Sequence, residues 1–583
     1  MAEQLRESAS GRFFTMWILN NAYFQVLIAS LLTVAVYALG FSGGFYFDDE
    51  WNILRNQALQ LDSLAFEGLW NAALSGTAGP LGRPISVLSF ALNHVFFGLD
   101  PFYFKLVNLT IHVFCGWVIY ALALALSEHL PKMPVQRRHL FAFLVMLLWL
   151  LHPLNLSTVL YPVQRMASLS ALFCLLGMFA YVKARHVSRA GWGARAGLYA
   201  LSFLVFWPLA MYSKENALLF PIYLFLIELV FLKFQNPAEG KTSRVIVLSY
   251  GVLFVLPGVL LSLYLVFFFP DWILNGYANR DFSLGERLLT QSRVIAFYLG
   301  QVFLPINSSL GLFHDDFALS TSLLSPWTTV VAVLFVFVAV VAAFSGIRKY
   351  PVIAFGVLFF LAAHSMESTI FSLELVHEHR NYLAIFSVLF AIAYYLVIGS
   401  DKFSSLRVLL AGSLIIFFGL TTLTRAAVWG EPVVHVITEV SNHPLSPRAN
   451  YGLGKQYAIY ANALDGSAQK TEAIQSAVKY FEKSAELRAS YVDGLFGLLM
   501  LEGLEGHQMS EESYRSLLRR LRIAPFSNNT YNYLHGVLSC LEAGDCEISN
   551  RKMNEIFDAC RDNPGFSGKH ARNVQERYQR YRK

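Results

Sequence analysis

The stretch WTTVVAVLFVFVAVVAAF, residues 327–344, decides the fold class, because it contains no charged side chain. An α-helix needs about 20 mainly apolar residues to cross a hydrocarbon core of about 30 Å. Similar runs lie on both sides of this stretch, at residues 24–39, 104–126, 141–151, 159–182, 198–211, 218–232, 245–269, 352–363, 383–398 and 408–423. We therefore predict an all-α, polytopic transmembrane bundle of about 11 spans, in which the two shortest runs are either spans or buried helices.

The composition agrees with a membrane protein. Hydrophobic residues make up 55% of the 583 residues and charged residues only 14%, with 45 Lys and Arg against 39 Asp and Glu and a net charge of +6. An ordinary soluble protein has about 25% charged residues. Together with a mean hydropathy of +0.47, this excludes disordered, collagen-like and small disulfide-rich secreted chains, and it disfavours a large soluble enzyme.

The loops between the runs alternate in charge, which predicts an orientation. If Arg6 and Arg12 near the N-terminus lie in the cytoplasm, the cation-rich loops all share that side, at residues 132–138, 183–195, 233–244, 348–349 and 402–407. The opposite loops contain most of the acids, so the external side is the expected working face. An odd number of spans also places the C-terminal region outside.

Two segments need separate treatment. The first apolar run lacks a small-residue cleavage site, so we expect it to remain as a signal anchor. The stretch at residues 286–304 is apolar but includes Arg287, Gln291, Arg293 and Gln301, and as a span it would break the charge pattern. We predict that it forms an interfacial or re-entrant helix.

The C-terminal region becomes polar after Arg425, and from about Pro444 its small and large apolar residues are spaced as in paired helices. The pairs are expected at residues 450–487, 491–522 and 531–560. This pattern resembles tetratricopeptide repeats, with a period of about 34 residues, and an irregular helical bundle is the alternative. Such repeats bind proteins or support a neighbouring domain, so they predict a protein partner.

Three of the five cysteines lie in this C-terminal region. In an oxidising compartment, proximity favours a bridge between Cys540 and Cys546, which leaves Cys560 free.

Three adjacent acids, Asp48, Asp49 and Glu50, follow the first span directly. Placing acidic side chains near lipid is energetically unfavourable, so their presence here requires an explanation. Either a carboxylate accepts a proton from an acceptor hydroxyl or helps to hold a cation, or the acids cap a helix that begins near Trp51.

More polar residues are expected on the same side of the membrane. Any one of them alone is more often an interfacial anchor or a turn residue. Taken together, they place carboxylates suited to a base beside cations suited to a phosphate. The set includes Arg83, His152, Arg165, Lys214, Glu215, Glu378, His379, Arg380 and Tyr382.

The order of these motifs matches a known family. They are Phe47-Asp48-Asp49, Arg83-Pro84, His152-Pro153 with Arg165, Lys214-Glu215, EHRNYL at 378–383, then Arg425, Trp429 and Glu431, and PLSPRAN at 444–450. The chain resembles the transmembrane and tetratricopeptide-repeat O-mannosyltransferase family and its bacterial relatives, which are glycosyltransferases of the GT-C fold. Its few repeats are more similar to the bacterial members and leave the acceptor open. The resemblance implies a GT-C transmembrane catalytic domain at residues 1–430, with its first external loop at 42–100, and an external repeat domain at 431–583.

The resemblance also implies a reaction, in which a sugar passes with inversion from a polyprenyl-phosphate carrier to an external hydroxyl group. Its position in the motif makes Asp48 the expected base, with Asp49 as the second candidate. The departing phosphate needs cations nearby, and these are Lys214, Arg380, Arg83 and Arg165. The expected supporting residues are Glu50, His152, Glu215, Glu378, His379 and Tyr382.

The partners expected are the polyprenyl-phosphate sugar, the bilayer and an exported protein acceptor bound by the repeats. Nucleic acid is not expected, because the cations follow topology. No metal or other cofactor is predicted, since GT-C enzymes with lipid monophosphate donors generally work without one. The expected location is a bacterial inner membrane with the active site and the C-terminal domain in the periplasm, and the endoplasmic reticulum membrane with a lumenal site is the alternative.

Two other functions remain open at this stage. One is a transporter or scaffold protein for lipid-linked sugars, which would need charges at mid-membrane and duplicated halves. The other is a transferase that modifies a glycolipid or a polysaccharide.

Overall fold

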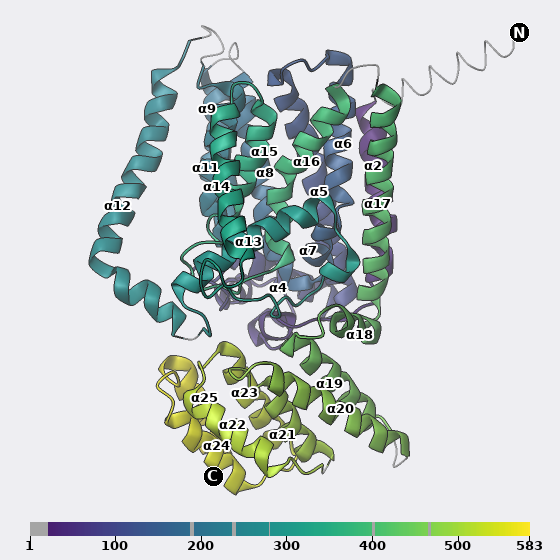
Figure 1. Ribbon diagram of the computed structural model, residues 1–583, viewed down its shortest axis with the longest axis vertical. Coiled ribbons are helices and arrows are strands. Elements are labelled where there is room, and N and C mark those ends of the chain that lie inside the picture. The colour runs from purple at the N-terminus through teal and green to yellow at the C-terminus, as the bar shows by residue number, and fades with distance from the viewer. Residues whose placement is uncertain are drawn as a thin grey trace, which may run out of the picture.

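The computed structural model describes residues 21–186, 192–235, 241–278, 280–398, 403–464, 468–505 and 507–582. Within these ranges the chain is helical, and its β-structure is limited to one isolated bridge between Gln235 and Thr242. Figure 1 shows two parts stacked end to end, a bundle of long helices and a group of shorter C-terminal helices. The all-α prediction is therefore confirmed.

The bundle contains the apolar helices. They are α2 (Ala22–Tyr37), α5 (Pro101–Leu126), α6 (Arg138–Leu150), α7 (Leu156–Leu160), α8 (Arg165–His186), α9 (Trp192–Ala200), α10 (Trp207–Met211), α11 (Phe220–Ile227), α12 (Arg244–Tyr277), α14 (Thr328–Gly346), α15 (Pro351–His364), α16 (Asn381–Ile398) and α17 (Ser404–Gly430). Buried side chains from most of these helices join in one large hydrophobic core.

Eight helical segments among the described residues are long and apolar enough to cross a membrane. A ninth candidate is the pair Val135–Leu150 and Pro153–Leu160, which bends by 52° at a short break. The break contains His152-Pro153, where proline lacks an N–H group and disfavours the α conformation of the residue before it. The chain is a multi-pass membrane protein.

The number of qualifying spans is lower than the eleven or so that the sequence predicts. Run 141–151 belongs to the bent pair, and run 352–363 forms α15, which has only 14 residues. Run 245–269 lies in α12, where the apolar segment Arg244–Leu260 is again a shorter one. The difference arises at two short helices, which are below the length that a span needs, and at α12, for which the count covers the described residues only.

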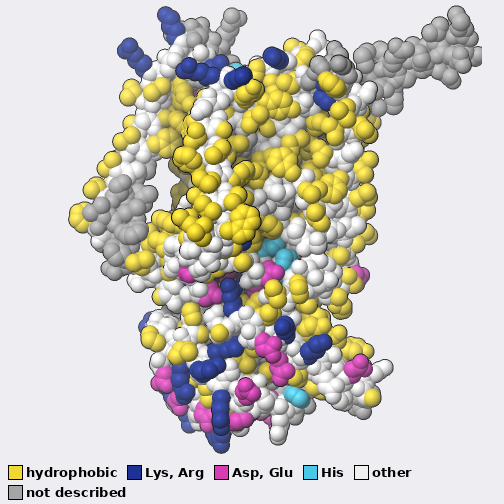
Figure 2. Space-filling model, viewed as in Figure 1, with side chains coloured by type: hydrophobic (Ala, Val, Ile, Leu, Met, Phe, Trp, Pro, Cys, Tyr) yellow, Lys and Arg dark blue, Asp and Glu magenta, His cyan; other side chains and the backbone are white. Residues whose placement is uncertain are grey.

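The distribution of charge along the molecule is visible in Figure 2. Hydrophobic side chains cover the visible sides of the bundle, and Lys and Arg side chains gather at the end that points away from the C-terminal helices. Acidic and histidine side chains appear at the junction between the two parts. The cation-rich loops therefore share one end of the bundle, as the sequence predicts, although Arg6, Arg12, Arg189 and Lys402 lie outside the described residues.

The junction end of the bundle contains short helices and loops. Figure 1 shows α4 (Pro84–Phe97) at this end and α13 (Leu284–Phe303) lying across the bundle near it. Helix α3 (Phe66–Leu74) packs on α4. Helix α13 is not among the candidate spans found in the described residues, which agrees with the prediction of an interfacial helix at residues 286–304.

The C-terminal part has a hydrophobic core of its own. Its helices are α18 (Pro432–Asn442), α19 (Pro447–Asn462), α20 (Ala468–Leu487), α21 (Asp493–Glu505), α22 (Glu511–Ile523), α23 (Asn528–Ala543), α24 (Asn550–Arg561) and α25 (Gly568–Tyr581). The first six helices from α19 onward coincide with the residue ranges of the three predicted pairs. Helices α19 and α20 pack together, as do α21 and α22, but in the third range α24 packs on α22 and α23 packs on the additional helix α25. Whether these pairs are tetratricopeptide repeats stays a prediction.

Phe481 on α20 shows why small residues recur in this part. Its ring or backbone lies so close to Gly454, Gly494 and Gly497 that a β-carbon at any of these positions would overlap it.

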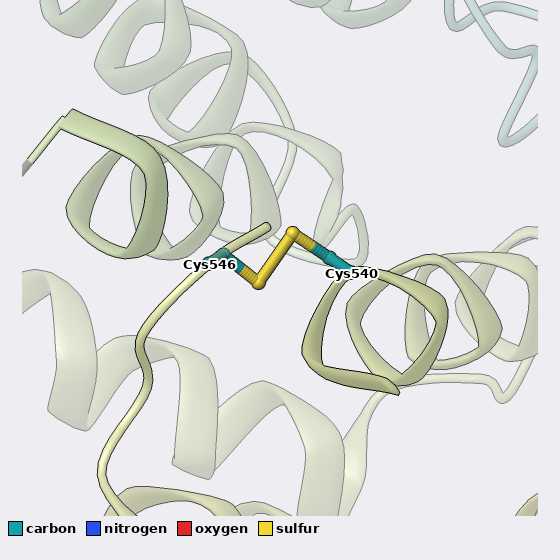
Figure 3. The surroundings of a disulfide bond; sticks show 2 residues. All are labelled: Cys540 and Cys546. Carbon is teal, nitrogen blue, oxygen red and sulfur yellow. A yellow bond between two sulfur atoms is a disulfide. The ribbon is translucent and has the colours of Figure 1, made fainter. Parts of the chain in front are cut away.

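Figure 3 shows the bridge between Cys540 and Cys546 at the end of α23. The predicted pairing is confirmed, and Cys560 is free and buried.

Candidate active site

The two neighbouring acids of the first loop have different environments. Asp49 is fully buried, and its carboxylate accepts hydrogen bonds from the backbone N–H groups of Tyr46 (2.8 Å) and Val163 (2.7 Å). These bonds close the turn at Tyr46 and join the loop to the segment that leads into α8. Asp49 therefore holds the loop in place.

Asp48 is half-buried and lines a cavity. Its backbone N–H donates to the Tyr161 hydroxyl at 2.7 Å. Burial raises the pKa of Asp48 from its usual value near 3.8 to about 6, while the Arg448 guanidinium and the Tyr161 hydroxyl act in the opposite direction. A carboxylate with a pKa slightly below neutral is ionised at pH 7 and still basic enough to accept a proton.

The cavity beside Asp48 has a volume of about 530 Å³ and lies between the first loop and the C-terminal helices. This volume falls within the range of about 300 to 1,000 Å³ that is usual for ligand pockets. The loop contributes aromatic and acidic side chains, and helices α19, α21 and α23 contribute the facing wall. Its lining includes Phe47, Asp48, Glu50, Trp51, Arg448, Tyr451, Lys455, Asp493, Phe496, Asn529, Asn532 and Tyr533.

Glu50 lies at the edge of this cavity. It pairs with Arg55 at 2.6 Å and approaches Lys455 of α19 at 3.9 Å. The third acid of the predicted motif thus faces the C-terminal helices.

A cluster of cations lies at the same end of the bundle. Lys214 pairs with Glu367 at 3.1 Å, and Arg380 approaches the same carboxylate at 4.0 Å. Burial acts to raise the pKa of Glu367, but Lys214 and Arg380 together hold it at about 2. Both cations are more than nine-tenths buried, so their charge is weakly screened by water.

Arg83 belongs to the same region. It pairs with Glu215 at 2.9 Å, next to Lys214 in the chain, and its backbone adopts a left-handed conformation with φ of 51°. Arg83 also lowers the pKa of Asp48. The structure therefore places Asp48, Arg83, Lys214, Glu215 and Arg380 in one connected region, as the sequence predicts.

His379 lies near these cations. Its ring stacks on that of His377 at 5.0 Å between centroids, and Lys214, Arg380 and Arg83 all contribute to its electrostatic environment. The two imidazoles do not diverge, because residues 378–380 form a 3₁₀ turn rather than part of an α-helix. His379 is thus a neighbour of the cation cluster.

Helix α13 positions the loop that holds Glu367. The Arg287 guanidinium is fully buried and donates to the backbone carbonyls of Glu367 at 2.6 Å and Thr369 at 3.0 Å, and also to that of Leu373. Gln291 donates to the carbonyl of Leu375 at 2.8 Å. Two of the polar residues that distinguish residues 286–304 from the other apolar runs, Arg287 and Gln291, therefore fix one wall of the cation cluster.

Glu378 has a separate set of partners. It pairs with Arg425 of α17 at 2.9 Å and accepts a hydrogen bond from the backbone N–H of Gly311 at 2.8 Å. His314 lies 3.7 Å from the same carboxylate. Glu378 thus joins α17, the loop at 311–316 and the start of α16 beneath the site.

Three predicted site residues lie inside the bundle instead. Arg165 is fully buried and donates to Asn108 (2.7 Å), Asn93 (2.8 Å) and the carbonyls of Ser89 (3.0 Å) and Phe104 (2.9 Å). His152 accepts from the N–H of Leu154 and bonds the carbonyl of Val302 at 3.1 Å.

Tyr382 is the third of these residues. Its hydroxyl bonds His112 at 2.8 Å inside the bundle. Sequence position alone could not distinguish these three from the other predicted site residues. Polar groups near helix ends can form hydrogen bonds inside the protein or bind a substrate. The structure does not place Arg165 in the cluster formed by Lys214, Arg380 and Arg83.

Three further residues of the region were not predicted as site residues. Arg448 from the C-terminal helices lines the cavity and pairs with Glu374 at 3.1 Å, and Glu374 also pairs with Arg280 at 2.8 Å. Glu367 is the common partner of Lys214 and Arg380. A signal for Arg448 was present, because it lies in the PLSPRAN motif that the resemblance rests on.

The acids of the loop at 314–316 tie the two parts together. Asp315 accepts from the Ser446 hydroxyl and from the backbone N–H of Arg448, and Asp316 bonds His443 at 3.0 Å.

In the described ranges, no three or more His, Cys, Asp or Glu side chains converge as a metal site. That transfer needs no metal stays a prediction.

An apolar cavity of about 640 Å³ opens between α13, α14, α15, α16 and α17. Phe360 in its wall lies 4.6 Å from the His364 ring, and that ring lies 5.2 Å from Tyr298 of α13. The Tyr298 hydroxyl in turn bonds the backbone of His377. A continuous row of side chains therefore leads from the apolar cavity to the histidines beside the cation cluster.

Comparison with known proteins gives partial matches. The chain is 29% identical to human protein O-mannosyl-transferase TMTC2 over 174 residues, which is 29% of this chain and 20% of the relative. It is 28% identical to human protein O-mannosyl-transferase TMTC4 over 206 residues, 34% of this chain and 28% of the relative. It is 30% identical to mouse protein O-mannosyl-transferase TMTC1 over 161 residues, 27% of this chain and 16% of the relative.

The matched parts cover 16% to 28% of the lengths of these three relatives. No family model and no solved structure matches the chain. The relatives carry the name of the family that the motifs indicate, so the resemblance is confirmed: over about a third of its length or less, the chain is similar to the TMTC protein O-mannosyl-transferases.

Proposed function

We propose that the chain is a membrane glycosyltransferase that moves a sugar from a polyprenyl-phosphate donor to a hydroxyl group of an exported protein. One observation carries the proposal. Asp48 and Arg448 line a cavity shared with the C-terminal helices, and Arg448 pairs with Glu374, whose backbone carbonyl accepts from Arg380 of the cation cluster. The printed names of the relatives, protein O-mannosyl-transferases, support the same reaction class.

In this proposal Asp48 is the general base. It takes the proton of the acceptor hydroxyl while the hydroxyl oxygen forms a bond to the anomeric carbon of the sugar. The bond between that carbon and the phosphate oxygen breaks, and the lipid phosphate leaves with both electrons. Attack from the face opposite the phosphate inverts the anomeric configuration.

The negative charge on the departing phosphate is stabilised by Lys214, Arg380 and Arg83. Preorganised cations in a site shielded from water stabilise charge that develops in the transition state. Glu367 and Glu215 hold these cations in position before the donor binds. The apolar cavity between α13 and α17 suits the isoprenoid chain of the donor, since its lining is almost wholly hydrophobic.

The acceptor is proposed to lie in the cavity between the first loop and α19, α21 and α23. Aromatic side chains there offer contact area, and Asn529 and Asn532 offer amide groups able to bond a peptide backbone. The proposed location is a bacterial inner membrane, with the site and the C-terminal helices in the periplasm. A lumenal site in the endoplasmic reticulum membrane is the alternative.

The test uses the purified full chain with a polyprenyl-phosphate sugar and a hydroxyl-bearing acceptor. We expect Asp48→Asn to lower transfer by about 10²- to 10⁴-fold, the usual contribution of a general base, with donor binding unchanged. We expect Asp49→Asn to lower the melting temperature instead, because an amide cannot accept both backbone hydrogen bonds.

Asp62→Asn is the matched control, because Asp62 is an exposed acid of the same loop, and it should leave transfer unchanged. Retained turnover in Asp48→Asn would contradict the role of this base. Donor binding without any glycosylated product would favour a transporter or scaffold for lipid-linked sugars. Transfer to a glycolipid or polysaccharide but not to a protein would change the acceptor class.

A further inference from the structure

Arg448 belongs to the C-terminal helices, yet its backbone is held by the bundle. It follows Pro447 in the first turn of α19, and Ser446 caps this helix. The Asp315 carboxylate accepts from the Ser446 hydroxyl and, at 3.3 Å, from the backbone N–H of Arg448. A loop of the bundle therefore fixes where this side chain begins.

The Arg448 side chain reaches from α19 into the mouth of the bundle. Its guanidinium donates to Glu374 at 3.1 Å, lies 5.3 Å from the centre of the Phe47 ring and lies 5.5 Å from that of Tyr491. Only 11% of the side chain is exposed. Its Nε is buried and has no hydrogen-bond partner among the described residues.

The residue beneath this guanidinium has an unusual backbone. Phe47 has φ of 31°, a value that side-chain-bearing residues rarely adopt, and it directly precedes Asp48. Such a conformation persists only where surrounding contacts enforce it. The Phe47 ring is held between Phe313, at 5.4 Å and edge-on, and the Arg448 guanidinium, which attracts the face of an aromatic ring.

The same guanidinium also reaches the donor side of the site. Glu374 lies in the loop that leads to His377 and Arg380, and Arg380 donates to the carbonyls of Glu374 (2.7 Å) and Leu375 (3.0 Å). One side chain from the C-terminal helices thus contacts both the residue before Asp48 and the loop that carries Arg380.

We infer that Arg448 is a positioning residue of the site: it holds the Phe47–Asp48 turn against the loop at 374–380, so the C-terminal helices complete the active site. This inference rests on the proposed function. It goes beyond an acceptor-binding role for the C-terminal helices, because it predicts that they act on the base itself.

The first arm of the test is independent of activity. The N–H groups of Asp49 and Glu50 bond the carbonyls of Tyr46 (2.8 Å) and Phe47 (3.2 Å), so hydrogen exchange at these amides reports on the turn. We expect Arg448→Gln to speed exchange at residues 46–50 and 374–380 at least ten-fold in the full chain. Arg551→Gln, which removes an exposed cation from α24, should change neither segment.

The second arm is the pH profile of kcat/KM for transfer. The charged and titratable groups that act on Asp48 are Arg448, Glu374, Arg83 and Tyr161, and Asp49 is its neighbour in the chain. A base must be deprotonated, so the wild-type rate should fall as the pH drops through about 6. Arg448→Gln removes a cation that favours the ionised carboxylate, so the midpoint should move to higher pH. Arg448→Lys keeps the charge and should restore the midpoint.

The outcomes separate the two proposals. Unchanged exchange at residues 46–50 in Arg448→Gln would overturn the inference, whether or not the protein is active. A rate that falls equally at every pH, with an unmoved midpoint, would also overturn it, because a merely structural role predicts that result. Absence of Asp48-dependent transfer in the wild type would refute the proposed function, and the exchange arm would still decide the role of Arg448.

Discussion

Asp48 and Asp49 are neighbours of identical chemistry with different surroundings. Asp49 accepts two backbone hydrogen bonds and is fully buried. Asp48 faces a cavity of about 530 Å³. The motif predicts an acid that acts as a base, but the hydrogen bonds of the folded loop decide which of the two carboxylates lines the cavity. Arg165 differs from Lys214 and Arg380 in its partners and not in its burial: it donates to asparagines and carbonyls inside the bundle, whereas Lys214 and Arg380 pair with Glu367.

The first prediction at the residue scale concerns Arg165. Arg165→Lys keeps the charge but loses the planar guanidinium group that donates hydrogen bonds to Asn93, Asn108 and two carbonyls. Because buried groups left without partners each cost about 1–3 kcal/mol, we expect the unfolding free energy to fall by about 3 kcal/mol. Thermal unfolding in detergent measures the loss. Arg348→Lys, at an exposed position, is the control.

A role of Arg165 in binding the donor phosphate predicts a different result. If Arg165 bound the donor phosphate, Arg165→Lys would weaken donor binding at an unchanged melting temperature. We expect lowered stability with donor affinity retained in the molecules that stay folded.

At the scale of elements, α13 supports the site from outside it. One face of this helix carries the buried Arg287 and Gln291, which bond carbonyls between residues 367 and 375. The other face includes exposed apolar residues such as Leu288 and Phe303. A helix of this kind suits the membrane interface, where one side meets lipid and the other a polar loop.

The second prediction tests this support. Arg287→Ala removes the donors that hold the carbonyls of Glu367, Thr369 and Leu373. Glu367 should then hold Lys214 and Arg380 less firmly, so we expect faster hydrogen exchange at residues 365–376 and donor binding about ten-fold weaker, or about 1.4 kcal/mol. Leu288→Ala, on the exposed face of the same helix, should change neither. Unchanged donor affinity in Arg287→Ala would contradict the assignment.

At the scale of the whole molecule, the two ends of the bundle differ in charge. Lys and Arg side chains gather without visible acids at the end away from the C-terminal helices, whereas the junction shows acids and histidines together with cations. The positive-inside rule predicts that the cation-rich end lies in the cytoplasm. The C-terminal helices and the Asp48 loop contact each other, so they must share one side of the membrane.

Cysteine labelling tests this topology. We expect Lys455→Cys, on α19, to react with a membrane-impermeant maleimide from outside intact cells, and Lys349→Cys, between α14 and α15, to react only after permeabilisation. Background labelling should be low, because Cys115, Cys174 and Cys560 are buried and Cys540 is bonded to Cys546. Labelling of both positions from the same side would contradict the orientation.

The sequence by itself determined the features that depend on local composition. Apolar runs predicted most of the spanning helices, since a helix in lipid must satisfy its own backbone and cover itself with apolar side chains. The spacing of small and large residues predicted the C-terminal helix pairs, and the polar residues of 286–304 predicted an interfacial helix. The cations and acids of the site were also named in advance, apart from Arg448, Glu367 and Glu374.

Only the tertiary structure decided which polar residues are free to act. Arg165, His152 and Tyr382 stand in motifs beside Lys214 and Arg380, but their hydrogen-bonding groups are engaged inside the bundle. Arg448 lies 400 positions from Asp48 in the chain, and it reaches the Phe47–Asp48 turn only because α19 docks on the loop at residue 315. Whether a polar group is free depends on partners distant in sequence, and folding alone brings those partners together.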